Sequence, residues 1–341
     1  MIHQYVNRSD AELRYETFSG DPFVSFLYSR VREKPAWLYR ALTSSRLTNL
    51  LAAARFDRPL SRPDAMRRQW ARSLGVDFSE CADDPATLDT PRKVFERKIR
   101  YWDCRPMDPN PRAVVSPADA RALVGSFRQT SALFLKDKFF AFDELLGDSR
   151  TEWLRAFDGG EYALFRLTPD RYHYTHTPVA GIVRDVYDLD GRFQSCHPAV
   201  VVAQASPYSK NRRRVVVYDT DAGDGTGVGL VAMIEFVALM IGDIVSLYSA
   251  TRYEDPVALR PGMRVERGCP SGLFRPGSST VVLLFQRDRI RFADDLVTYQ
   301  LASEANSVFS RAWNTPAAET DVRVRETVAM GPSRRMAGSF S

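Results

Sequence analysis

Two histidines stand three residues apart near the middle of the chain, in the segment RYHYTHTP. His173 and His176 would share one face of a helix, where they could bind a metal. Pro169 and Pro178 leave little room for that helix, and the four cysteines (Cys81, Cys104, Cys196 and Cys269) offer no matching ligand spacing. We therefore predict no metal site. General acid–base catalysis and ordinary hydrogen bonding both stay open for the pair, because neutral imidazole titrates near working pH.

Two further segments carry polar groups beside apolar runs. Gly277-Ser278-Ser279-Thr280 leads directly into the apolar run 281–285, which is typical of a tight turn entering a buried strand. Ser116-Pro117-Ala118-Asp119 is typical of a helix start, with Ser116 as N-cap and Pro117 in the first turn. It predicts a helix over 117–123, with Asp119 as a first-turn acid favoured by the helix dipole. Neither segment indicates a function by itself.

In combination and in order, these segments resemble the phosphatidylserine decarboxylases, pyruvoyl enzymes that make phosphatidylethanolamine. The resemblance rests on VVSPADA (114–120), LTPDRYHYTHTPVAGIV (167–183) and GLFRPGSSTVVLLF (272–285). The family shows SPADG, a DYHRxHxPxxG-like segment, and LGST or GGST before an apolar strand. The resemblance covers most of the chain. The first residues of the chain are similar to the N-terminal portion of the bacterial branch that carries GGST.

The resemblance implies a proenzyme that cuts its own backbone. A serine hydroxyl attacks the carbonyl before it, and elimination and hydrolysis leave a covalent pyruvoyl group at the new N-terminus. A serine needs a base held by a third group for such an attack. By resemblance, Asp119 orients His176 and His176 activates the serine. The pyruvoyl ketone then forms a Schiff base with the substrate amine and acts as an electron sink, and His173 reprotonates the α-carbon after CO2 leaves.

Two serines compete for the role of nucleophile. An ungapped match of 274–285 to the GGST branch selects Ser279 and cleavage of the Ser278–Ser279 bond. The upstream side alone, matched to the LGST branch, selects Ser278 and the Gly277–Ser278 bond. The downstream match favours Ser279.

Several positions depart from the family pattern. Ala120 replaces the glycine of SPADG, residues 177–181 lose an acid, and Val237 replaces a glycine. These departures motivate two alternatives to phosphatidylserine decarboxylation. The first is pyruvoyl-dependent decarboxylation of a free amino acid or another amine-bearing carboxylate, and the second is a non-catalytic lipid-binding paralogue.

The N-terminal third is the basic part of the chain. Between Arg30 and Arg72, eleven Lys and Arg face three acids, although the whole chain of 341 residues has a net charge of only +5. Apolar and aromatic residues recur at helical spacing in the overlapping segment from Phe23 to Ala54. This pattern suits helices lying on an anionic lipid surface. We predict a helical N-terminal membrane-association region over 1–105.

The rest of the chain has the sequence pattern of strands rather than helices. A helical N-terminal part followed by a β-rich part predicts the α+β fold class. Residues 106–314 are expected to form a β-rich decarboxylase core, and residues 315–341 a disordered tail. The runs that indicate strands are 113–115, 162–167, 178–189, 192 onward, 199–203, 214–218, 229–233, 236–247 and 281–285.

Composition limits the functional classes further. An apolar fraction of 44% and a charged fraction of 26% are ordinary for a globular chain, and no CxxC pair is present, so the thiols indicate a reducing compartment. No signal peptide is visible, and the apolar stretch 227–241 is interrupted by Glu235 and too short to span a bilayer. We expect a peripheral protein on the cytoplasmic side of the membrane. Its expected partners are phosphatidylserine, an anionic membrane and its own two processed chains, with a homodimer left open and no nucleic acid.

Overall fold

The fold was analysed in a computed structural model that describes most of the chain. The described residues are 3–16, 56–57, 72, 75–128, 131, 139–191, 197–203, 208–237, 243–277, 279–302 and 304–332. Ser278, the strand expected from residue 192, and nearly all of the basic segment 30–72 lie outside these ranges. Within that part of the chain, no helix combines the length and apolar character needed to span a bilayer.

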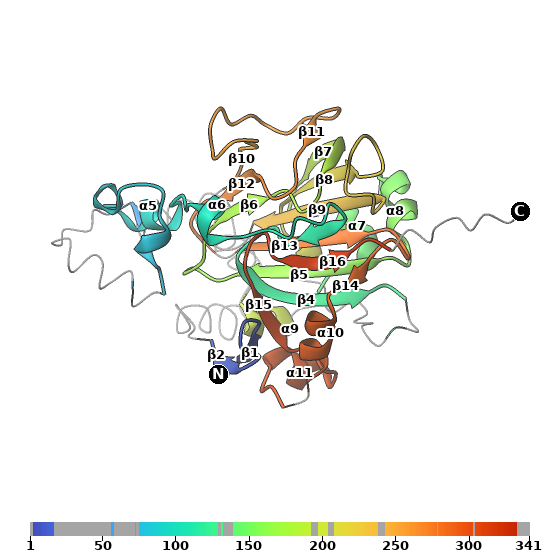
Figure 1. The fold of residues 1–341 in the computed structure, drawn as a ribbon. Helices are drawn as coiled ribbons and strands as arrows, with labels where there is room; N and C mark the ends of the chain where they lie inside the picture. The colour runs from blue at the N-terminus through green and yellow to red at the C-terminus, as the bar shows by residue number, and fades with distance from the viewer. Residues whose placement is uncertain are drawn as a thin grey trace, which may run out of the picture.

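A ten-stranded sheet forms the centre of the molecule, in the order β11-β7-β8-β9-β13-β5-β4-β15-β1-β2 (Figure 1). Its strands are β1 (Gln4–Asn7), β2 (Leu13–Tyr15), β4 (Ala120–Ser126), β5 (Glu161–Leu167), β7 (Gly181–Leu189), β8 (Arg213–Asp219), β9 (Leu230–Val237), β11 (Arg264–Val265), β13 (Ser279–Phe285) and β15 (Glu319–Val322). The β1–β15 pairing is parallel, and the other pairings of this sheet are antiparallel.

Two three-stranded sheets and a set of short helices complete the fold. The first small sheet is β10 (Ile244–Ser246), β12 (Pro270–Phe274) and β6 (Tyr174–His176), and the second is β14 (Arg291–Phe292), β16 (Thr327–Met330) and β3 (Ala113–Val115). The α-helices are α5 (Pro91–Phe95), α6 (Tyr101–Cys104), α7 (Phe142–Leu146), α8 (Thr151–Phe157), α9 (Pro198–Ala203), α10 (Asp294–Leu301) and α11 (Val308–Trp313). Short 3-10 helices are η2 (Phe78–Glu80), η3 (Pro85–Thr87) and η4 (Tyr208–Lys210).

The large sheet separates two hydrophobic layers. Alternate residues of β13 supply both, since Val281 and Leu283 enter one layer and Val282 and Leu284 enter the other. The first layer is completed by the small sheets and α10, and the second by α7, α8, α9 and α11. Ser279 begins β13 with the alternation of Val281, so it belongs to the face covered by the small sheets.

The prediction of a β-rich core is confirmed. The runs 113–115, 162–167, 214–218 and 281–285 lie in β3, β5, β8 and β13. These strands are enriched in β-branched and aromatic residues and are buried on both faces, which explains why continuous apolar runs marked them.

The predicted division into three regions does not match the large sheet. Within the predicted helical region, residues 4–7 and 13–15 form strands β1 and β2, and β1 pairs with β15 of the expected tail. The prediction of disorder from Thr315 is wrong for residues 319–330, which form β15 and β16. β15 alternates acids with smaller residues. Arg121 of the adjacent β4 pairs with Asp321, and Arg166 of β5, one strand further, pairs with Glu319.

Two predicted elements have the opposite secondary structure. The helix expected over 117–123 is absent, because Ala120–Ser126 is strand β4 and the Ser116 hydroxyl donates to the Ala118 carbonyl instead of capping a helix. The run at 199–203, expected as a strand from its valines, lies in helix α9. Strand pairing with β5 and β15 overrides the local helix preference of β4, and packing against α11 overrides the local strand preference of α9.

Candidate active site

Ser279 lies at the first position of β13, between two neighbouring strands. It pairs with Leu167 of β5 on one side and Val237 of β9 on the other. The residue is fully buried, and its Oγ has no hydrogen-bond partner in the described structure. Two residues earlier, Gly277 has φ of 152°, a conformation that side-chain-bearing residues rarely adopt. A buried hydroxyl without a partner is costly, so its position calls for a chemical explanation.

His173 is the second buried group with an unpartnered atom. Its Nδ1 lies 2.7 Å from the Arg171 carbonyl oxygen, and because a carbonyl only accepts, Nδ1 carries the proton. The lone pair of the neutral ring is therefore on Nε2, which is buried without a partner among the described residues. The ring stacks on Phe95 with centroids 3.5 Å apart. Burial, reinforced by Arg97, lowers the pKa of His173 to about 3, so the ring is neutral at physiological pH.

The chain segments that carry these two groups run side by side. At one end, Leu167 pairs with Ser279, and at the other end the Phe274 amide donates to the His173 carbonyl over 3.1 Å. The connection from β5 to β6 thus lies against the connection from β12 to β13. The sheet pairing brings the histidine segment and the serine segment together.

His176 has both ring nitrogens occupied. Nδ1 donates to the Gly268 carbonyl over 2.9 Å, and Nε2 accepts from the Tyr172 hydroxyl over 2.9 Å. Tyr172 also lies 2.7 Å from the Tyr253 hydroxyl. Burial lowers the pKa of His176 to about 3. His176 is therefore a neutral imidazole whose basic nitrogen faces a phenol.

Asp119 lies in a buried ion pair. Arg105 donates to both carboxylate oxygens, over 3.1 and 2.7 Å, and the Val324 amide donates to Oδ1 over 2.8 Å. Burial alone would raise the pKa of Asp119, but the Arg105 guanidinium and these hydrogen bonds hold it below its ordinary value. Arg105 continues to Glu80 through two bonds of 2.8 Å.

The direct contact expected between Asp119 and His176 is not seen in the described residues. Arg105 and Val324 occupy the carboxylate, and Gly268 and Tyr172 occupy the imidazole. The two residues are nevertheless neighbours, because the His176 amide donates over 2.8 Å to the carbonyl of Pro117, two residues before Asp119. A direct Asp119–His176 bond would require both side chains to exchange partners.

Sequence reasoning missed three side chains of this region: Arg105, Tyr172 and Glu235. Glu235 is buried on β9 and accepts a 2.6 Å hydrogen bond from Thr175, the residue between Tyr174 and His176. Burial raises the pKa of Glu235. A signal was present, since Glu235 is the acid that interrupts the apolar stretch 227–241. Arg105 and Tyr172 carry no comparable local signal.

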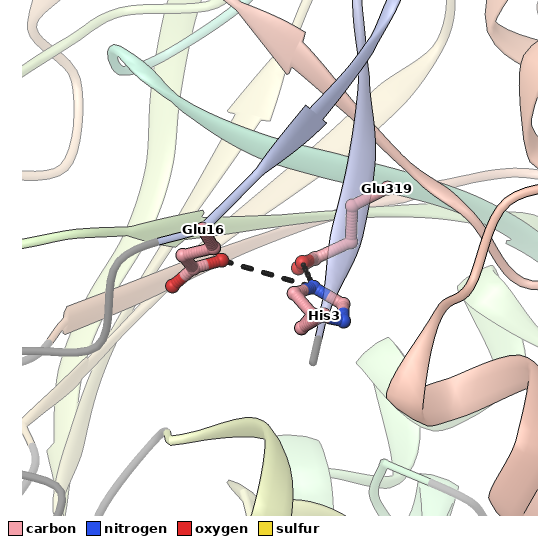
Figure 2. Close-up of side chains that lie close together, drawn as sticks. All are labelled: His3, Glu16 and Glu319. Carbon is pink, nitrogen blue, oxygen red and sulfur yellow. Dashed lines mark hydrogen bonds and ion pairs between the residues drawn. The ribbon is translucent and has the colours of Figure 1, made fainter. Parts of the chain in front are cut away.

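A separate polar cluster lies on the other face of the sheet, where Glu16 and Glu319 point toward the imidazole of His3 (Figure 2). The His3 Nε2 is 2.7 Å from Glu319 and 3.7 Å from Glu16. These three side chains could in principle ligate a metal, since their ligand atoms lie within 4.8 Å of one another. Arg166 already donates to both carboxylates, with four bonds of 2.5 to 2.9 Å. A guanidinium at this place supplies the positive charge that a metal would bring, so the cluster is a buried ion-pair network.

The sequence is similar to a known family and to several curated proteins. The family model for phosphatidylserine decarboxylase matches residues 92–308. The chain is 32% identical over 240 residues to a phosphatidylserine decarboxylase proenzyme of Azotobacter vinelandii, covering 68% of this chain and 82% of the relative. The chain belongs to the phosphatidylserine decarboxylase family. A proenzyme of the same name from Ruminiclostridium cellulolyticum is 24% identical over 295 residues, covering 86% of this chain and 91% of the relative.

The family match includes the predicted site residues and excludes the polar cluster. Asp119, His173, His176 and Ser279 all lie within 92–308. His3, Glu16 and Glu319 lie outside that span. The family resemblance predicted from the sequence is confirmed.

Proposed function

We propose that this protein cuts itself between Ser278 and Ser279 and then decarboxylates phosphatidylserine to phosphatidylethanolamine and CO2. The observation that carries the proposal is the buried, unpartnered Oγ of Ser279, at the start of a central strand and beside the histidine segment. Family membership supports the same reaction, since the matched relatives are named proenzymes.

The self-cleavage uses groups of this chain alone. The Ser279 Oγ attacks the carbonyl carbon of residue 278, so that an ester replaces the amide and the nitrogen of residue 279 becomes an amine. β-Elimination breaks the Cβ–Oγ bond and releases the upstream chain as a carboxylate. The dehydroalanine left at position 279 takes up water and loses ammonia, which leaves a pyruvoyl group.

The two histidines divide the proton transfers. Both are neutral imidazoles, and a neutral imidazole can accept the serine proton. His176, near Asp119, is assigned as the base by resemblance, and Tyr172 must release its Nε2 before it can act. His173 has an unpartnered Nε2 and is assigned the return of a proton to the substrate. The same free Nε2 also makes His173 the competing candidate for the base.

The residues around Ser279 fit a covalent pyruvoyl group. Its precursor hydroxyl is buried among Leu167, Val237 and the apolar side chains of β13, so water is excluded from it. Once formed, the group supplies a carbonyl that takes up electrons as CO2 leaves. No metal ligand is required for this chemistry.

The large and small chains stay together after cleavage in this proposal. β13 lies between β5 and β9, and β15 lies between β4 and β1, so two strands of the small chain are enclosed by strands of the large one. The basic segment 30–72 would hold the protein on the cytoplasmic face of an anionic membrane. A homodimer stays open, and light scattering of the purified protein tests it.

Two assays test the proposal. Mass spectrometry of the purified protein should find a fragment 279–341 without a free N-terminal amine, and uncut 38.6 kDa protein would reject self-processing. Parallel assays of CO2 release from phosphatidylserine vesicles and from free amino acids should show turnover of the lipid. Turnover of the soluble compounds alone would support the alternative substrate class, to which Ala120 and residues 177–181 point. If the wild type stays uncut, and Ser278→Ala and Ser279→Ala give the same gel pattern as the wild type, the result would support a non-catalytic lipid-binding protein.

A further inference from the structure

Glu235 lies on the same face of the large sheet as Ser279, one strand away. β9 and β13 are antiparallel, with Val237 opposite Ser279 and Glu235 opposite Val281. Paired residues of antiparallel strands share a face, so Glu235 and Ser279 are diagonal neighbours, whose α-carbons are typically about 7–8 Å apart. The surrounding layer on this face includes Met233, Val237 and Val281, and Arg214 of β8 is the one charged residue paired directly opposite Glu235 among the described strands. A buried acid in such a layer is unusual.

The carboxyl of Glu235 connects this face to the strand that carries the histidines. The Thr175 hydroxyl donates to Glu235 Oε1 over 2.6 Å, and both residues are buried. Thr175 is the middle residue of β6, directly before His176 and two residues after His173. The hydrogen bond therefore ties β6 to β9, the strand paired with Ser279.

A third strand is shaped around the same hydrogen bond. A Cβ on Gly272 would lie 2.7 Å from Thr175 Oγ1 and 2.9 Å from Glu235 Oε1, closer than side-chain atoms tolerate. Gly272 belongs to β12, which has an irregular register against β6 at this point and leads to Gly277 and the cleavage segment. The hydrogen bond thus lies where the histidine strand, the strand beside the nucleophile and the strand before the cleavage site meet.

We propose that Glu235 is a positioning residue for self-cleavage, which acts through Thr175 to fix the histidine strand relative to Ser279. This inference rests on the proposed function. Glu235 is buried, and a hydrogen bond is strong in such an environment. Burial raises the pKa of its carboxyl, and the Thr175 hydrogen bond and Arg214 oppose that rise. Loss of the bond would leave a buried polar group unpaired and free β6 to shift.

The test measures the rate of self-cleavage in the full chain, by pulse-labelled cell-free synthesis and a chase. Glu235→Leu and Thr175→Val should each produce the fragment 279–341 at least tenfold more slowly than wild type. Glu235→Gln keeps an acceptor for Thr175 and should cleave within about threefold of wild type. Gly272→Ala, which crowds the same bond, should be slow. The Glu235→Leu/Thr175→Val double variant should be no slower than the slower single variant, because both remove the same bond.

Tyr218→Phe is the matched control. It removes one buried hydroxyl from the same layer. In the described part of the chain that hydroxyl has a long hydrogen bond of 4.0 Å to the Met233 sulfur, and the variant should cleave like wild type. Thermal unfolding of each variant, made in a cleavage-blocked Ser279→Ala background, separates positioning from folding. If Glu235→Leu fails to fold, Thr175→Val, which preserves volume, carries the test.

Three results would overturn the inference. Wild-type rates in Glu235→Leu or, where that variant does not fold, in Thr175→Val would show that the bond is not needed. A Glu235→Gln variant that folds but cleaves as slowly as Glu235→Leu would show that the hydrogen bond is not the cause. Uncut wild type would remove the proposed function and this inference together, whereas cut wild type with equally fast variants rejects the inference alone.

Discussion

Two adjacent residues of β5 face opposite sides of the large sheet and two different polar environments. Arg166 faces the helix-covered side, where it donates to Glu16 and Glu319, and Glu319 also bonds His3. Leu167 faces the other side and pairs with Ser279, whose hydroxyl has no partner in the described structure. Both regions are buried, but one is bonded at every carboxylate and the other holds unpaired atoms.

The difference separates a stabilising region from the proposed reactive region, the segments of Ser279 and His173. The Oγ of Ser279 and the Nε2 of His173 are among several buried polar atoms without a hydrogen-bond partner in the described residues, and these two lie in adjoining segments that carry nucleophilic and basic groups. The Arg166 network instead joins strands from three parts of the chain: Glu16 follows β2, Arg166 is in β5 and Glu319 is in β15. Two of these parts lie before the proposed cleavage bond and one after it.

Ser279→Ala should have the largest effect on the reactive region. The proposal predicts complete loss of self-cleavage, because alanine has no hydroxyl to attack the carbonyl carbon of residue 278. The free energy of unfolding should change by less than about 1 kcal/mol relative to another uncut variant, since the lost hydroxyl made no hydrogen bond. Gel analysis and urea unfolding measure the two quantities.

Ser278→Ala is the control for this prediction. It should still cut, although more slowly. Cleavage in Ser279→Ala and none in Ser278→Ala would assign the nucleophile to Ser278.

His173→Ala should lower turnover of phosphatidylserine by about 10²- to 10⁴-fold, as expected for loss of a proton-transfer group. If His173 serves only in turnover, the purified variant still contains the fragment 279–341, while CO2 release from vesicles falls. Loss of the fragment itself would reassign His173 as the base for self-cleavage. His176→Ala provides the reciprocal comparison and should abolish the fragment.

Arg166→Met should disturb the stabilising region. The change leaves two buried carboxylates without their cation, and breaking a buried pair in this way costs about 3–5 kcal/mol of unfolding free energy. Urea unfolding in the Ser279→Ala background measures the loss. Arg14→Met, at an exposed pair with Asp10, should leave the free energy of unfolding nearly unchanged. Equal effects of the two substitutions would contradict the assignment of the network as a stabilising element.

Acid should weaken the same network, because Glu319 loses its charge at low pH. Burial opposes the charge of Glu319, but Arg166 and His3 lower its pKa to about 2, below its ordinary value of 4.5. A carboxyl whose pKa falls on folding adds stability that is complete above pH 4.5 and is lost as the pH falls toward 2. The loss should be about 3 kcal/mol for this group. Glu319→Gln should flatten this part of the pH profile, and parallel profiles for variant and wild type would refute the prediction.

The sequence predicted the reactive region better than the stabilising one. Ser279, His173 and His176 lie in motifs that are contiguous in sequence, and their strands have continuous apolar runs. Arg166, Glu16 and Glu319 are isolated charged residues as many as 303 positions apart, and only the sheet order brings them together. The acids of β15 made its sequence resemble an exposed tail. The arginines that neutralise these acids are distant in sequence, so no local pattern predicts a strand there.

Partner choice was the other limit of sequence reasoning. The motif Ser-Pro-Ala-Asp marked Asp119 as a candidate site residue but did not indicate its ion pair with Arg105, fourteen positions earlier. The valines of 199–203 favour a strand in isolation, and packing of α9 against α11 gives a helix.

The N-terminal chemistry of the small chain tests the central claim most directly. Intact-mass and fragmentation spectra of the purified protein should show a chain that begins at position 279 with a pyruvoyl group and ends at Ser341. A chain that begins with an unmodified serine amine, or a protein that stays at 38.6 kDa after prolonged incubation, would contradict the account.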